Sequence, residues 1–149
     1  MRMQRVGMST AGVVAAVALL GVGLPVGYFL VEYGCGREEE RLGEALAEDP
    51  VLDDGVDGAR VEESYQECDD DDLTAVAGKT YRYGGDRESV LAHYRDAAQA
   101  HGWRYRTGDC LTKSIDGAMA GLTLEGPGPG DRSLHVEIVA ARQDSEPWC

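Results

Sequence analysis

Four cysteines are the residues of this chain whose chemistry follows most directly from their type and spacing. They stand at Cys35, Cys68, Cys110 and Cys149, and none forms the C-x-x-C pair that is typical of zinc or redox sites. An even number of cysteines in a small domain outside the cytoplasm predicts disulfides. Four cysteines allow three connectivities, between which the sequence does not decide. We favour Cys68 with Cys110, because both flank predicted strands, and by elimination Cys35 with Cys149.

An acidic run is the second feature that could do chemistry. It consists of Asp69, Asp70, Asp71 and Asp72. Four adjacent carboxylates cannot be buried unpaired, so we expect a turn or a solvated loop there. Several carboxylate oxygens could bind a cation loosely, which makes this run the one weak candidate for a metal site. A solvated run of charge is the commoner explanation of such a sequence.

Other metal and catalytic patterns are incomplete. The segment that begins at Asp53 resembles a calcium loop, but Gly55 and Ser64 occupy positions where the loop needs oxygen-rich ligands. His93 and His101 are eight residues apart, too far for the adjacent-turn pair that zinc prefers, and His135 lies on a distant predicted strand. The sequence also contains no G-x-S-x-G motif. We therefore predict no catalytic residue and no cofactor, and interpret the chain as non-enzymatic.

The element that decides where these residues are placed is an uncharged run over residues 6–31. As a helix it would be about 39 Å long, enough to cross a hydrocarbon core of about 30 Å with some tilt. The competing interpretation is a cleaved secretory signal, whose apolar region is usually about 7 to 15 residues long. The length of this run favours an uncleaved single-pass anchor in the lipid bilayer.

Charge predicts the orientation of this anchor. Arg2 and Arg5 precede the run and acidic residues follow it, so residues 1–5 are expected in the cytoplasm and the rest of the chain outside the cell membrane. The outside portion carries all 27 acidic side chains and 12 of the 14 basic ones, a net charge of −15. Such a surface repels phosphate backbones, which argues against nucleic acid as a partner.

Residues 32–57 are expected to form an acidic stalk, and residues 58–149 a small extracytoplasmic domain. Residues 86–101 have the clearest helical pattern, with Asp86 as N-cap and Gly102 as the stop. Strands are predicted over residues 59–67, 79–83, 103–115, 119–125 and 134–142, the third of them interrupted at 108–109. Short turns between consecutive strands predict an α+β fold, in which one amphipathic helix covers an antiparallel sheet of about five strands.

The Gly102-Trp103 pair that ends this helix, followed by Cys110-Leu111-Thr112-Lys113 on the next strand, resembles small secreted or membrane-anchored proteins of actinobacteria. The excess of arginine over lysine agrees with a GC-rich genome of that kind. The resemblance covers about residues 58–142 and implies an uncharacterised domain without assigned catalytic residues. Many such proteins carry a lipobox that this chain lacks, so lipid attachment is not implied.

The expected role is therefore a non-enzymatic domain that presents an interaction surface near the membrane, for instance to a cell-envelope protein. The alternative is an extracytoplasmic module that senses or binds a cation or small ligand through the acidic loop. The sequence does not indicate the oligomeric state or the identity of the partner.

Overall fold

The computed structural model describes residues 34–107, 110–125 and 132–143. The expected transmembrane segment, residues 6–31, lies outside these ranges. Within them, no helix is both long enough and apolar enough to cross a bilayer. The part of the chain from Cys35 onward forms one compact unit.

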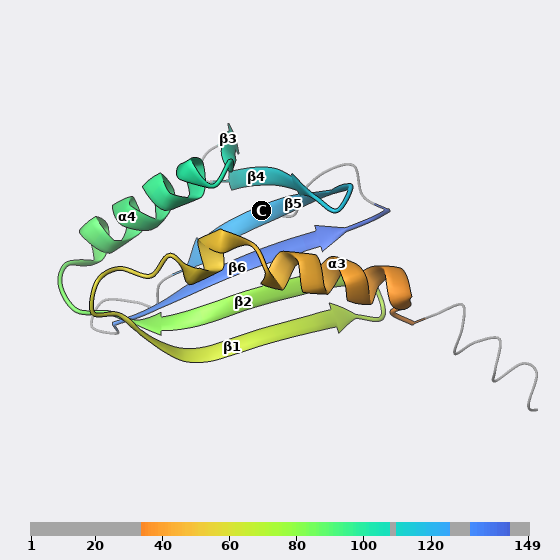
Figure 1. Cartoon of the computed structure of the whole chain (residues 1–149), viewed down its shortest axis with the longest axis horizontal. Helices are drawn as coiled ribbons and strands as arrows, with labels where there is room; N and C mark the ends of the chain where they lie inside the picture. Colours follow the sequence, from red (N-terminus) through yellow and green to blue (C-terminus); the bar gives the residue numbers. More distant parts are fainter. Residues whose placement is uncertain (1–33, 108–109, 126–131, 144–149) are drawn as a thin grey trace, which may run out of the picture. The chain divides into compact units, whose positions relative to one another are not determined.

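The described elements are two α-helices, a short 3-10 helix and one antiparallel sheet (Figure 1). The fold is therefore α+β, as predicted. The sheet has six strands in the order β1-β2-β6-β5-β4-β3. In chain order the elements are α3 (Arg37–Ala47), η2 (Pro50–Asp53), β1 (Arg60–Asp69), β2 (Thr74–Arg82), α4 (Arg87–Ala100), β3 (Arg104–Thr107), β4 (Cys110–Ile115), β5 (Ala118–Glu125) and β6 (Ser133–Ala141).

The strand expected over residues 103–115 is two strands, β3 and β4, which pair with each other. This accounts for six strands where about five were expected. Strand β6, the last in sequence, lies in the middle of the sheet between β2 and β5. The alternation of this strand agrees with a sheet that has one covered face, because every second side chain is apolar and faces the core. The inward residues Leu134, Val136, Ile138 and Ala140 are all buried.

Helix α4 begins where the sequence predicts. The carboxylate of Asp86 accepts hydrogen bonds from the backbone N–H groups of Glu88 and Ser89, at 3.1 and 2.9 Å. Gly102 follows the helix with φ of +88°, a conformation that favours glycine. The buried face of α4 includes Tyr94, whose ring packs against Tyr81 of β2 with centroids 5.7 Å apart. The helix therefore lies on the sheet along the stripe that its spacing predicts.

Helix α3 and η2, which lie in the segment expected to be a stalk, contribute to the same core. Leu42, Leu46, Val51 and Leu52 are at most 1 % exposed and belong to the hydrophobic cluster of the domain. The compact unit thus begins at Cys35 and not at Gly58, which differs from the expected boundary. Four apolar residues in a charged segment are a weak sequence signal, yet they are enough to bind an amphipathic helix to a sheet.

The buried carboxylate of Asp49 joins η2 to Trp103 and to Lys113 of β4. Asp49 is 5 % exposed and caps η2 by accepting a hydrogen bond from the N–H of Val51. It also accepts hydrogen bonds from Trp103 Nε1 at 3.2 Å and from Lys113 Nζ at 2.6 Å. The ammonium group of Lys113 lies 5.8 Å from the centroid of the Trp103 ring. A buried charge needs such partners, so this cluster fixes the position of η2 against β4.

Candidate functional site

Helices α3 and α4 lie on the same face of the sheet, and no described element covers the opposite face. The helix side carries Ala75, Ala77 and Tyr81 of β2, together with the inward residues of β6 paired with them. Neighbouring residues of each strand point to the other side. An antiparallel sheet with one face covered commonly exposes polar side chains on the other. This uncovered face is where the candidate site lies.

Two rows of directly opposed residues cross the uncovered face. The first row runs Tyr65, Gly78, Glu137 and Thr123, and the second runs Glu63, Thr80, His135 and Glu125. Each row has one residue from β1, β2, β6 and β5, so residues from distant parts of the chain lie side by side. Neighbouring strands are about 4.8 Å apart, which places adjacent members of a row within side-chain contact.

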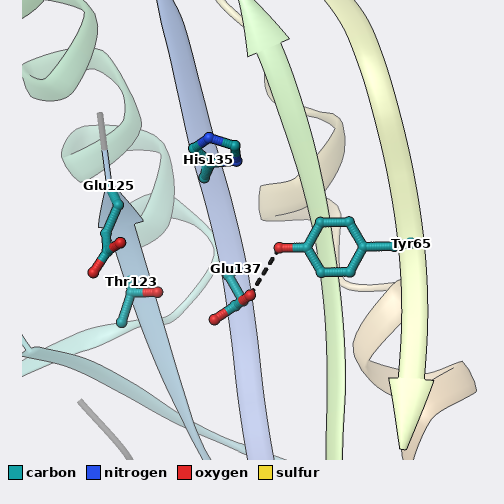
Figure 2. Close-up of a pocket in the computed structure, with 5 residues that line it drawn as sticks. All are labelled: Tyr65, Thr123, Glu125, His135 and Glu137. Carbon is teal, nitrogen blue, oxygen red and sulfur yellow. Dashed lines mark hydrogen bonds between the residues drawn. The ribbon is translucent and has the colours of Figure 1, made fainter. Parts of the chain in front are cut away.

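Tyr65 crosses a neighbouring strand to reach its partner. Its hydroxyl donates a hydrogen bond of 2.8 Å to Glu137 Oε2, two strands away (Figure 2). Gly78 of β2 lies between them, and a Cβ atom at this position would collide with the Tyr65 ring and hydroxyl. The absence of a side chain at Gly78 is therefore what lets the phenol lie flat across β2.

Burial and the hydrogen bond to Glu137 raise the pKa of Tyr65 above its ordinary value, and the charges of nearby glutamates act in the same direction. The phenol consequently stays protonated at physiological pH and serves as a donor. In the second row, the Thr80 hydroxyl and His135 Nδ1 form a hydrogen bond of 3.0 Å. These two cross-strand bonds hold Glu137 and His135 on adjacent positions of one face of β6.

A recess of about 280 Å³ opens between the two rows. It is lined by Tyr65, Thr123, Glu125, His135 and Glu137 (Figure 2). The view in Figure 2 looks onto the uncovered face, with the helices behind the sheet. The lining offers two carboxylates, a phenol, a hydroxyl and an imidazole, and so combines hydrogen-bond acceptors with net negative charge. Such a recess suits a small cationic group that donates hydrogen bonds.

The acidic run forms the turn between β1 and β2, as expected, but its carboxylates do not converge. Asp69 Oδ1 accepts from the N–H of Asp71 at 2.9 Å, and Asp70 Oδ1 accepts from the N–H of Cys35 at 2.8 Å. Among the described residues, no three His, Cys, Asp or Glu side chains are arranged to hold a metal ion. The carboxylates of Asp69 and Asp70 thus accept hydrogen bonds from backbone N–H groups of the domain.

The favoured disulfide between Cys68 and Cys110 is wrong, because Cys68 is bonded to Cys35, with Cα atoms 6.2 Å apart. Cys68 is the next-to-last residue of edge strand β1, whereas Cys110 begins β4, and β2, β6 and β5 lie between these two strands. Four strand spacings of about 4.8 Å exceed the reach of a disulfide. The expected Cys35–Cys149 disulfide is therefore also wrong, because Cys35 is bonded to Cys68. Cys110 is itself disulfide-bonded, and Cys149 lies outside the described residues.

His93 is exposed on the surface of α4 and His101, which follows this helix, is half-buried. His93 and His101 both reach Asp54: His93 Nε2 lies 3.1 Å from the backbone oxygen and His101 Nε2 lies 3.0 Å from Oδ2. They join α4 to the loop after η2. His135 is exposed on the uncovered face, where it is part of the recess.

Aromatic side chains form part of the core. The domain contains no phenylalanine, and Tyr81, Tyr83 and Trp103 are buried in its interior. Tyr105, two residues after Trp103, is 46 % exposed on edge strand β3.

The recess itself was not predicted from the sequence. Tyr65, Thr123, Glu125 and Glu137 carry no motif and come from three different strands. The available signal was the alternation of β6, which places His135 and Glu137 on the outward face, but the pairing of β6 with β2 and β5 depends on the topology. Comparison with protein-family models, with curated proteins and with solved structures finds no match for this chain.

Proposed function

We propose that this chain is a non-enzymatic binding module, anchored in the membrane by residues 6–31, that presents the uncovered face of its sheet to a cell-envelope protein. The sequence supports the anchor and its orientation. The Cys35–Cys68 disulfide agrees with an oxidising compartment outside the cytoplasm. The proposed partner surface is the side of the sheet opposite α3 and α4.

One observation carries the proposal: the uncovered face holds a hydrogen-bonded set of side chains around a recess, where a face with no role needs only solvated polar residues. Among the described residues of this face, acidic side chains outnumber the basic ones, which are Arg60, Arg82 and Arg104. The acidic residues that the register places on this face are Glu63, Glu67, Asp69, Glu125 and Glu137. Complementary charge gives specificity and speeds association, so the partner should present a basic surface.

Next to the acidic residues runs a less polar row in which Val76 of β2 opposes Val139 of β6, followed by Gly121 of β5. Both valines are half-buried, so part of each side chain remains accessible. A partner would bury this row under its centre and place basic groups over the acidic rows. Apolar contact at the centre with a charged rim is the usual anatomy of an interface.

The cation-sensing alternative has less support, because Asp69 and Asp70 already accept backbone hydrogen bonds within the domain. A calcium titration tests it directly. If the turn were a calcium site, millimolar calcium would raise the melting temperature of the protein by mass action. We expect no such shift.

The proposal is tested with the full chain in detergent, by cross-linking and capture of partners from envelope extracts. The Glu67→Lys and Glu137→Lys variants reverse charge on the uncovered face. The Glu44→Lys variant reverses an exposed charge on α3, on the opposite side of the sheet, and is the matched control. The proposal predicts that the first two variants lose a partner that the control retains. Equal capture by all three variants, or no enrichment over an anchor-only control, would contradict it.

A further inference from the structure

The recess between the two rows indicates which chemical group of the partner the uncovered face binds. This inference rests on the proposed function. We infer that it binds the ammonium group of a lysine side chain supplied by the partner protein. The argument uses the charge of the recess, the hydrogen bonds already made inside it, its size, and the lysines of the chain itself.

The first step is the charge balance. Glu125 and Glu137 both line the recess, and neither forms an ion pair among the residues that the structure describes. Glu137 has one hydrogen bond there, from Tyr65, and Glu125 has none. Two neighbouring carboxylates without a cation repel each other, and a bound cation removes this repulsion. The occupant should therefore carry positive charge.

The second step is the geometry of the acceptors. Glu137 Oε2 already accepts a hydrogen bond from the Tyr65 hydroxyl, so a planar guanidinium fork could use both oxygens of Glu125 but not both oxygens of Glu137. An ammonium group needs no such pair, since its three N–H donors can go to three separate acceptors. Glu137 Oε1, the Glu125 carboxylate and the Thr123 hydroxyl are three such acceptors on two adjacent strands. The Tyr65 ring adds an aromatic surface that attracts a cation.

The third step is size. A recess of about 280 Å³ admits one side chain but not a folded element. The half-buried row of Val76 and Val139 lies beside it and could contact the methylene groups of a lysine stem. A divalent metal is a poorer occupant, because the described residues include no set of three ligands arranged for one.

The fourth step concerns the source of the lysine. The chain contains two lysines, Lys79 and Lys113. Lys79 pairs with Asp53 and Lys113 with the buried Asp49. Both lysines lie on the helix side of the sheet with side chains at most 25 % exposed, so a second copy of this chain would have to rearrange its covered face to offer an ammonium group. The lysine is therefore supplied by a different protein, which agrees with the basic surface expected of the partner.

The experiment uses the full ¹⁵N-labelled chain in detergent and follows the amide signals of β5 and β6 during titration. The probes are N-acetyl-lysine methylamide, its norleucine analogue without the ammonium group, and N-acetyl-arginine methylamide. The lysine probe should shift the amides of Glu125 and Glu137 saturably at millimolar concentration. The norleucine probe should not, and the arginine probe should bind several-fold more weakly.

Variants locate the site. Glu137→Gln and Glu125→Gln should each weaken binding of the lysine probe about tenfold, whereas Glu44→Gln on α3 should leave it unchanged. Saturable shifts with the norleucine probe, tighter binding of the arginine probe, or equal binding by all variants would overturn the inference. If the lysine probe fails but charge reversal on the uncovered face still abolishes partner capture, the inference falls and the proposed function stands. If the probe binds but capture is insensitive to that face, the proposed function fails.

Discussion

Tyr65 and Glu137 are 72 residues apart in sequence and two strands apart in the sheet, yet a hydrogen bond of 2.8 Å joins their side chains over Gly78. This bond closes one wall of the recess and fixes one oxygen of Glu137. It also links β1, an edge strand, to the central strand β6 on the face that no described element covers. The geometry of the candidate site therefore depends on a glycine that takes no direct part in it.

Replacing Gly78 with alanine should expel the Tyr65 ring from its position, because the new Cβ atom would occupy the space of the ring and hydroxyl. Freed from burial and from Glu137, the phenol should then titrate near the ordinary tyrosine pKa of about 10. Tyrosine ¹³Cζ NMR across a pH titration measures this. The Gly84→Ala variant is the control, since a Cβ atom there meets nothing within 4 Å. An unchanged Tyr65 titration in Gly78→Ala would contradict the packing described.

Stability should fall at alkaline pH. The pKa of Tyr65 is raised in the folded protein, and so are those of Tyr81 and Tyr94, mainly by burial. The unfolded chain loses these protons above about pH 10, while the folded chain retains them. Their contribution is thus fully present below pH 10 and declines as the pH rises further. Melting temperatures between pH 8 and 12 should fall less steeply for Tyr65→Phe than for the parent; identical slopes would show that Tyr65 contributes nothing.

The buried Asp49 should matter far more for stability than an exposed aspartate with a similar partner. Replacing Asp49 with alanine leaves Lys113 and Trp103 Nε1 without their acceptor and should cost about 3 kcal/mol. Asp53 pairs with Lys79, but its side chain is 71 % exposed, so Asp53→Ala should cost less than about 1 kcal/mol. Denaturant unfolding of both variants provides the comparison. Similar losses of unfolding free energy in the two variants would mean that the buried Asp49 cluster stabilises the fold no more than an exposed ion pair does.

The Cys35–Cys68 disulfide closes a 33-residue separation and should stabilise the domain by about 4 kcal/mol in the chain-entropy model. The Cys35→Ser, Cys68→Ser double variant should lose about that much in denaturant unfolding. Non-reducing peptide mapping of the parent should recover Cys35 linked to Cys68. With that pair formed, Cys149 is the cysteine that remains for Cys110 and should appear linked to it. A peptide joining Cys68 to Cys110 would contradict the sheet order.

Local patterns predicted the helix over residues 86–101, the turn at the acidic run and the α+β class, because capping, charge and alternation act over a few residues. The disulfide pairing and the recess could not be predicted in the same way. Both depend on β6 entering the sheet beside β2, which brings Glu137 into the row of Tyr65. The role of residues 37–53 was also missed, since Leu42, Leu46, Val51 and Leu52 are few against many charges, and only tertiary packing shows that they are buried.

The most direct test of the central claim is site-specific photo-cross-linking of the full chain in its own membranes. A photoreactive residue replaces Thr123 on the uncovered face, and in a matched variant Asp96, which is exposed on α4 on the other side of the sheet. The account predicts a discrete adduct with one envelope protein from position 123 and none from position 96. An adduct from position 96 alone, or the same adducts from both positions, would contradict the proposal that the uncovered face is the binding surface.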